Sequence, residues 1–231
     1  LAGMFGVPAH TAHAEPDAPA QPAATYDSEI ILLTSAGQIR VDDPYVATGT
    51  KSAEWNSGSD TGYTRVAAGD FNGDGDAEIV AAKGTIIKVF DPVVQPNSQP
   101  VSFEVNLGTG RTVQLLVTGD FDGDGKAEFA VVHVDSGTNI QATLRVYDGG
   151  ANATAGQWTL FNSAQYGMMW QDMAAADFNG DNTDELVLAR NPSLQDKLVM
   201  IWKVNTWSVL AQGYYDFPWL AAVGGNFSTS R

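Results

Sequence analysis

The sequence repeats a nine-residue acidic segment three times without gaps. The copies are Asp70–Glu78, Asp120–Glu128 and Asp177–Glu185, and their first residues lie 50 and 57 positions apart. A fainter copy, Gly225-Asn226-Phe227, follows 49 positions later. Repetition at this period is typical of solenoids and propellers, in which one supersecondary unit stacks on the next. We therefore expect about four units in the chain.

Each unit places the same short apolar runs around its acidic segment. In the first unit Val66–Gly69 precedes the segment, Ile79–Ala82 and Ile86–Phe90 follow it, and a weaker run, Val101–Val105, completes the unit. Such runs are short, partly β-branched or aromatic, and bounded by Gly, Asp, Asn and Pro, which favours strands over helices. Four strands in about 50 residues is the size of one propeller blade. The pattern predicts an all-β chain: a β-propeller of four-stranded blades, present as an incomplete array of about four blades.

Two further patterns suit stacked blades. Small residues precede the acidic segments and are expected where inner strands crowd the centre: Ala67, Ala68, Ala174 and Ala175. Seven positions before each segment begins stands a bulkier residue, and we expect these side chains to pack between neighbouring blades: Tyr63, Val113, Trp170 and Trp219.

Oxygen-bearing side chains occupy positions 1, 3, 5 and 9 of every acidic segment. They are Asp70, Asn72, Asp74 and Glu78; Asp120, Asp122, Asp124 and Glu128; and Asp177, Asn179, Asp181 and Glu185. Carboxylates gathered so closely repel one another, and a divalent cation removes that repulsion. Hard oxygen donors without His or Cys favour calcium over zinc or copper, and calcium takes six to eight oxygens. The sequence predicts about three Ca²⁺ sites, one in each complete segment.

The remaining positions of the segment also fit a loop that closes around an ion. Glycine stands at position 4 in all copies and at position 6 in two, where it permits unusual backbone angles. Asn182 takes position 6 in the third copy, and Asn is the next most tolerant of left-handed geometry. Position 7 varies as Asp76, Lys126 and Thr183, which suits a ligand supplied by the backbone carbonyl while the side chain faces water.

Two alternatives were weighed against the calcium prediction. An EF-hand needs a bidentate Glu at position 12 and flanking helices. Position 12 is Ala81, Val131 or Leu188, each inside a strand-like run, so the EF-hand prediction fails. The other alternative is an Asx-rich turn that binds nothing, because Asp, Asn and Gly are ordinary turn residues. Three matching copies at blade spacing favour the metal.

The pattern Asp-Phe-Asn-Gly-Asp-Gly-x-Ala-Glu resembles the FG-GAP or VCBS-type repeat of integrin α-subunit propellers and of many bacterial secreted proteins. The resemblance covers roughly residues 26–231. It implies that each segment joins the first and second strands of a blade and binds calcium there. It also implies that the carbonyls of Asp76, Lys126 and Thr183 complete the shell. Asn182 and Asn226 depart from the pattern, and Asn226 leaves a fourth site in doubt.

Residues 1–25 lack the repeat and differ from it in composition. We expect residues 1–14 to be the C-terminal part of a secretory signal with cleavage after Ala14, and the Pro- and Ala-rich residues 15–25 to be a linker. Residues 26–231 would then be a partial propeller, truncated at its C-terminus. No apolar run in residues 26–231 approaches the ~20 residues needed to span a bilayer. The expected location is secreted, extracellular or cell-surface.

The composition excludes several classes of binding partner and of catalytic site. With 12 Lys and Arg against 27 Asp and Glu, the formal net charge is −15, which disfavours nucleic acid and anionic membranes. No cysteine is present, and no catalytic fingerprint is found. His133 falls on an expected strand and is predicted to be a surface or packed residue without a catalytic role. We expect a non-enzymatic module for ligand binding or adhesion, with an extracellular protein or carbohydrate as partner and further blades or domains in the same chain. One alternative is the non-catalytic propeller of a larger secreted hydrolase or lyase that degrades polysaccharide. Another is a purely structural spacer on a surface protein.

Overall fold

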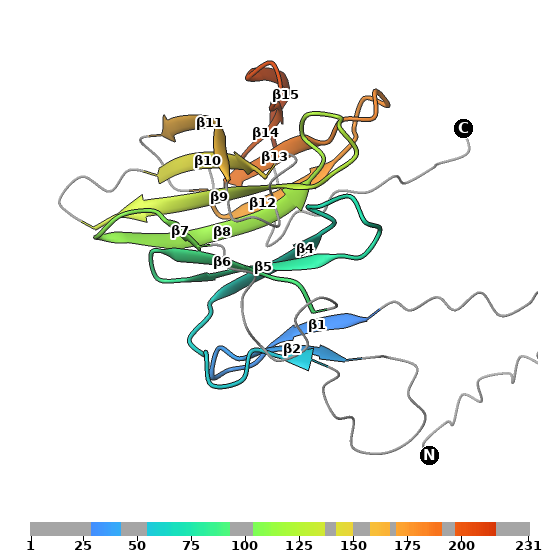
Figure 1. The fold of residues 1–231 in the computed structure, drawn as a ribbon. Coiled ribbons are helices and arrows are strands. Elements are labelled where there is room, and N and C mark those ends of the chain that lie inside the picture. The colour runs from blue at the N-terminus through green and yellow to red at the C-terminus, as the bar shows by residue number, and fades with distance from the viewer. Residues whose placement is uncertain are drawn as a thin grey trace, which may run out of the picture.

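The strands pair with their neighbours in the chain and form four antiparallel sheets (Figure 1). The computed structural model describes residues 29–42, 55–92, 104–136, 142–149, 158–166, 170–190 and 197–215. The expected signal and linker, Trp219 and the fourth copy at residues 225–227 lie outside the described residues. Every regular element in the described ranges is a strand, and none of them contains a helix that could cross a membrane.

Three of the sheets are four-stranded meanders, and each begins just before an acidic segment. The strands of the first are β4 (Arg65–Gly69), β5 (Glu78–Lys83), β6 (Ile86–Phe90) and β7 (Glu104–Asn106). Those of the second are β8 (Arg111–Gly119), β9 (Glu128–Asp135), β10 (Ala142–Asp148) and β11 (Thr159–Tyr166). Those of the third are β12 (Asp172–Ala176), β13 (Glu185–Arg190), β14 (Leu198–Lys203) and β15 (Ser208–Tyr214). The predicted four-stranded blade is confirmed three times over.

The remaining sheet has three described strands. They are β1 (Ile30–Leu33), β2 (Ile39–Asp42) and β3 (Trp55–Asn56), in that order across the sheet. The run at 29–33 resembles the run that forms β5 in sequence, so β1, β2 and β3 correspond to the last three strands of a blade. The chain is therefore an all-β, incomplete propeller of about four blades.

The second strand of each complete blade is apolar on both faces. Residues 79–82 of β5 and 129–132 of β9 are all buried, as are residues 186–189 of β13. A strand with both faces buried must be covered on each side, which a blade between two neighbours achieves. Three apolar clusters provide that cover, one at each junction between successive sheets.

The bulky residues seven positions before the acidic segments lie in these clusters. Tyr63 packs edge-on against Phe90, with ring centroids 5.7 Å apart, in the cluster shared with β2 and β3. Trp170 packs edge-on against Tyr166, at the end of the preceding blade. Val113 joins the cluster between the β4–β7 and β8–β11 blades. The prediction of packing between blades is confirmed for these three.

The first strands of the blades lie close together at the centre. The Arg65 Nε donates to the Gln114 carbonyl at 2.6 Å, and the Thr118 hydroxyl donates to the Ala68 carbonyl, so β4 and β8 are bonded across the blade boundary. A Cβ at Gly119 would lie 3.0 Å from the Cβ of Ala175 in β12. Larger side chains would push these strands apart, which explains why small residues occupy the inner strands, as the sequence analysis expected.

The phenylalanine at position 2 of each acidic segment gives a matched test of the stacking. Phe121 is fully buried between its own blade and the next, whereas Phe178 is 41% exposed. Phe121→Ala is expected to lower the free energy of unfolding by about 3–5 kcal/mol, because it removes a buried ring and leaves a cavity. Phe178→Ala should cost well under half of that, measured for both by urea denaturation. Equal losses would contradict the stacked arrangement.

Candidate metal centres

The three acidic segments form loops of one design between the first and second strands of their blades. We call them the first loop (Asp70–Glu78, β4 to β5), the second loop (Asp120–Glu128, β8 to β9) and the third loop (Asp177–Glu185, β12 to β13). At position 4 the glycines have φ between 79° and 83°, and at position 6 Gly75, Gly125 and Asn182 have φ of 96°, 85° and 64°. The predicted need for left-handed backbone is confirmed at both positions, including the tolerance of Asn182 for it.

The aspartate at position 1 holds each loop in shape. In the first loop Oδ1 of Asp70 accepts the backbone N–H of Gly73 at 2.6 Å, and Oδ2 accepts that of Gly75 at 2.9 Å. Asp120 and Asp177 repeat these two bonds to positions 4 and 6. Partial desolvation opposes ionisation of Asp177, but the surrounding backbone N–H donors outweigh it and lower its pKa. The third loop therefore curls around an ionised carboxylate.

The aspartate at position 5 is fixed in a similar way. Its Oδ1 accepts the N–H of position 7, from Asp76 to Asp74 at 2.9 Å, from Lys126 to Asp124 at 2.9 Å, and from Thr183 to Asp181 at 3.1 Å. In the second loop the carboxylate oxygens of positions 1, 3 and 5 lie within 4.8 Å of one another.

The glutamate at position 9 ties the loop to the blade. It begins the second strand, is almost fully buried, and accepts through Oε2 the N–H of position 2: Phe71 to Glu78 at 2.9 Å, Phe121 to Glu128 at 2.7 Å, and Phe178 to Glu185 at 3.0 Å. Burial, with nearby carboxylates, raises the pKa of Glu78 to about 7 and that of Glu128 to about 8. A cation bound near these glutamates would favour their ionised form.

The second loop differs from the other two at position 3, where it has an aspartate in place of an asparagine. The Asn72 amide donates to Oδ2 of Asp74 at 3.0 Å and to Oε1 of Glu78 at 3.1 Å, and the Asn179 amide donates to Oε1 of Glu185. The second loop has Asp122 there, which cannot donate when ionised. Burial and the carboxylates of Asp124, Asp148 and Asp120 raise the pKa of Asp122. Negative charge is therefore least compensated in the second loop.

A residue on the third strand, which the sequence analysis missed, completes each cluster. In β13 and β14, Glu185 pairs with Lys203 across the ladder. Ile79 pairs with Phe90 and Phe129 with Tyr147, so Asp91 and Asp148 stand next along, across from Glu78 and Glu128. In the sequence each of these residues directly follows the aromatic residue at the end of the third apolar run of its unit. Their position across from the glutamates could be recognised only once the strand register was known.

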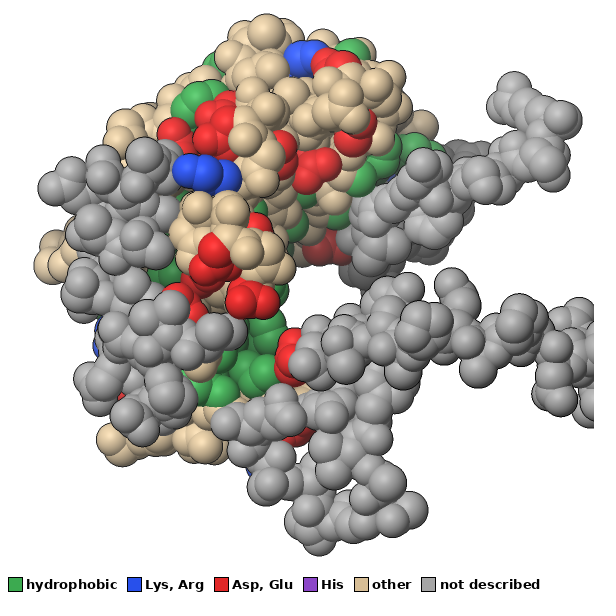
Figure 2. Space-filling model, turned by 45° about the vertical axis from the view of Figure 1, so that its right-hand side comes forward, with side chains coloured by type: hydrophobic (Ala, Val, Ile, Leu, Met, Phe, Trp, Pro, Cys, Tyr) green, Lys and Arg blue, Asp and Glu red, His purple; other side chains and the backbone are tan. Residues whose placement is uncertain are grey.

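The second loop brings together a donor set that fits calcium. Carboxylate oxygens of Asp120, Asp122 and Asp124 lie within 4.8 Å of one another, and so do those of Asp122, Glu128 and Asp148. Calcium–oxygen distances of 2.3–2.6 Å allow two ligands of one ion to stand up to about 5 Å apart. Both sets share Asp122 and contain oxygen donors only. Figure 2 shows Asp and Glu side chains in several groups on one face of the molecule, with few Lys or Arg among them.

Neighbouring loops are bonded to each other through positions 1 and 8. The N–H of Ala127 donates to the carbonyl of Asp70 at 2.8 Å, and that of Asp184 donates to the carbonyl of Asp120 at 2.6 Å. The Asp184 carboxylate also accepts the N–H of Asp120 at 3.0 Å. Asp184 thus helps to join the second and third acidic loops.

Position 7 only partly follows the prediction that its side chain faces water. Asp76 is exposed, but Lys126 and Thr183 are partly buried against the preceding loop. A Cβ at Gly73 would lie 3.2 Å from Cε of Lys126, and one at Gly123 would lie 2.8 Å from Cγ2 of Thr183. Glycine at position 4 of these two loops therefore also makes room for the next blade.

His133 lies in β9 and its side chain is fully buried. Burial, together with the charges of Arg145 and Arg111, lowers its pKa to about 4. Of the two expected placements, at the surface or packed in the strand, the structure shows the packed one. The position-12 residues Ala81, Val131 and Leu188 are likewise buried within strands, so no EF-hand is formed.

Comparison with known proteins places the loops in a described repeat family. The FG-GAP-like repeat family matches residues 120–188, which include the second and third loops, and the FG-GAP repeat family matches residues 62–85, which include the first. A comparison with curated proteins found no match.

Several solved structures show a distant likeness. A rhamnogalacturonan lyase of Bacillus licheniformis is 14% identical, with a TM-score of 0.44, over 78% of this chain and 45% of the lyase. The V. cholerae biofilm matrix protein Bap1 is 19% identical, with a TM-score of 0.41, over 80% of this chain and 27% of Bap1. Sqt1 of Saccharomyces cerevisiae is 14% identical, with a TM-score of 0.47, over 77% of this chain and 43% of Sqt1. The chain spans less than half the length of each, and similarity at this level assigns no function.

The raised pKa of Glu128 predicts an unusual pH dependence in the presence of a chelator. Between its ordinary value of 4.5 and about 8, the unfolded chain has lost this proton while the folded chain still holds it. Stability should therefore fall as pH rises through this window. Glu128→Gln, which cannot ionise, should flatten the fall in chemical denaturation measured at stepped pH. A wild-type stability that rises across the window, or an unchanged slope in the variant, would contradict the assignment.

Proposed function

Because this chain is an FG-GAP repeat protein, we propose that it is a calcium-stabilised propeller module of an extracellular protein and that it binds a partner rather than catalysing a reaction. The observation that carries the proposal is the carboxylate cluster of the second loop, where five acidic groups converge on one strand-to-strand turn: Asp120, Asp122, Asp124, Glu128 and Asp148.

Calcium would supply the positive charge that this turn lacks. The side chains of the second loop and Asp148 would hold the ion, and Glu128 would transmit its effect to the blade through its bond to the Phe121 N–H. The first loop offers a similar set in Asp70, Asn72, Asp74 and Glu78, with Asp91 nearby. Ca²⁺ affinities of extracellular modules, roughly 10⁻⁴–10⁻³ M, would suffice outside the cell.

A structural rather than catalytic role for the acidic groups fits their surroundings. Asp70, Asp120 and Asp177 are committed to backbone N–H groups of their own loops, and the position-9 glutamates are committed to the strand start. The side chain of His133 is buried and out of reach of a substrate. The proposed partner is an extracellular protein or a carbohydrate, bound by the disc that the blades form together, and the expected exclusion of nucleic acid and membrane rests on the net charge of −15.

Thermal unfolding with and without metal tests the calcium role. Each site stabilises the folded chain by about 1.4 kcal/mol when free calcium is ten times its dissociation constant. Calcium should raise the melting temperature, and magnesium should do much less, because Mg²⁺ demands a smaller octahedral shell and keeps its waters.

Two matched variants localise this effect. Asp148→Asn should shrink the calcium-dependent rise, whereas Asp135→Asn, at the other end of the same blade in an ion pair with Arg111, should leave the rise unchanged. Equal stabilisation by the two metals, or an unchanged rise in Asp148→Asn, would count against the proposal.

A further inference from the structure

The three acidic loops differ in charge at one place on the third strand. Across from the position-9 glutamate stand Asp91 in the first blade with an acidic loop and Asp148 in the second, but Lys203 in the third. Lys203 ends β14, where the β13–β14 ladder fixes its backbone beside Glu185. A carboxylate in two blades is thus replaced by an ammonium group in the other.

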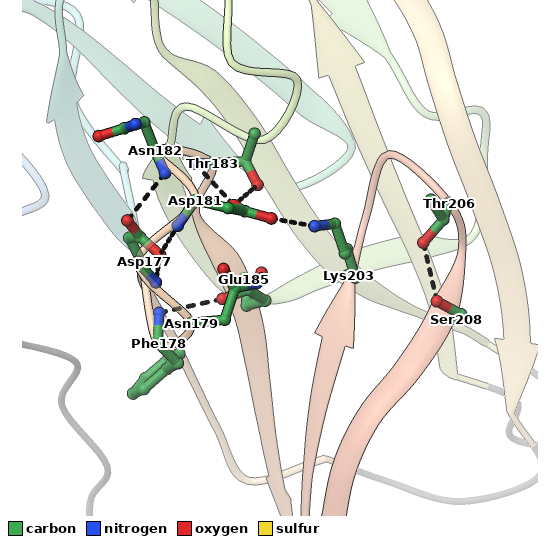
Figure 3. Close-up of polar contacts among 11 residues, drawn as sticks. Asp177, Phe178, Asn179, Asp181, Asn182, Thr183, Glu185, Lys203, Thr206 and Ser208 are labelled. Atoms are coloured by element: carbon green, nitrogen blue, oxygen red, sulfur yellow. Dashed lines mark hydrogen bonds and ion pairs between the residues drawn. The ribbon is translucent and has the colours of Figure 1, made fainter.

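The ammonium group of Lys203 points into the third loop. Nζ forms an ion pair with Oδ2 of Asp181 at position 5 (Figure 3). The other oxygen, Oδ1, accepts the backbone N–H of Thr183 at 3.1 Å and also the Thr183 hydroxyl. Both oxygens of the position-5 carboxylate are therefore occupied, and one of them is held by a full positive charge.

The matching oxygen in the first loop has a different partner. Oδ2 of Asp74 accepts the neutral amide of Asn72 at 3.0 Å. An Asn side chain carries a carbonyl oxygen that can turn toward a metal, whereas a lysine ammonium has three donors and no acceptor. Lys203 therefore cannot become a ligand, and a divalent cation held by Asp181 would face its positive charge directly.

We propose that Lys203 is a built-in counter-ion that takes the place of calcium in the third loop, so that this loop forms without metal while the first and second loops bind it. The inference rests on the proposed calcium function of the acidic loops. It makes the chain a mixed array: two blades whose turns depend on calcium, followed by one whose turn is closed by a side chain from its own third strand.

The number of carboxylates also differs between the second and third loops, in the direction that the proposal requires. The second loop and its strand partner bring five carboxylates together, from Asp120, Asp122, Asp124, Glu128 and Asp148. The third loop brings three, Asp177, Asp181 and Glu185, with Lys203 among them. Asp184, the remaining acidic residue there, faces the second loop instead.

Counting bound calcium in the full chain tests the proposal with a matched pair. Asp124→Asn and Asp181→Asn change the same loop position, and each asparagine can still accept the N–H of position 7 through Oδ1. At a free calcium concentration of about 10 mM, ten times the weakest dissociation constant expected of such modules, equilibrium dialysis with atomic emission should find one ion fewer bound to Asp124→Asn than to the parent. Asp181→Asn should bind the same number as the parent.

The reverse substitution should create a site. Lys203→Asp copies the arrangement at Asp91 and Asp148 and is expected to bind one ion more than the parent chain. Lys203→Gln, which removes the charge but keeps the length of the side chain, is the second variant in case Lys203→Asp does not fold, and it is also expected to gain an ion.

The calcium counts distinguish failure of the Lys203 proposal from failure of the proposed calcium function. Loss of one ion in both asparagine variants would overturn the role of Lys203 while leaving calcium binding intact. Loss of no ion in Asp124→Asn and in the equivalent Asp74→Asn would overturn the calcium function itself.

Discussion

In each blade with an acidic loop, a buried glutamate at the start of the second strand holds the loop closed. Glu78, Glu128 and Glu185 each close a loop by accepting the N–H of the residue that follows its first aspartate. Burial, with nearby carboxylates of the same turn, raises the pKa of each of these glutamates and so disfavours its charge. We propose that bound calcium supplies the compensating positive charge in the first and second loops, and that Lys203 supplies it in the third.

The loops and the stacking of blades form one system. Each loop begins where an inner strand ends, and its first carbonyl accepts an N–H from the next loop, as Asp70 does from Ala127. The phenylalanine that follows, Phe71 or Phe121, fills the cluster between two blades. A cation bound in a loop would therefore stabilise the boundary between blades as well as the turn, which explains how a chain without disulfides can gain rigidity.

The strand pattern and the backbone geometry of the loops were largely predictable from the sequence, because both depend on local spacing. The short apolar runs around Asp70–Glu78 predicted β4, β5 and β6, and the tolerance of Asn182 for positive φ was predicted from its residue type. The roles of Asp91, Asp148 and Lys203 were not predicted, since they depend on which residue of the third strand pairs with the glutamate. The contacts of Lys126 and Thr183 with the preceding loop were also missed, because they depend on how the blades stack.

The most direct test of the central claim is an anomalous difference map from crystals of the protein soaked in a lanthanide ion, a calcium substitute with strong scattering. The account predicts a peak in the second loop, bounded by the carboxylates of Asp122, Glu128 and Asp148, and no peak beside Lys203. A map without density in the second loop at full soaking would contradict the claim that these carboxylates hold a hard cation.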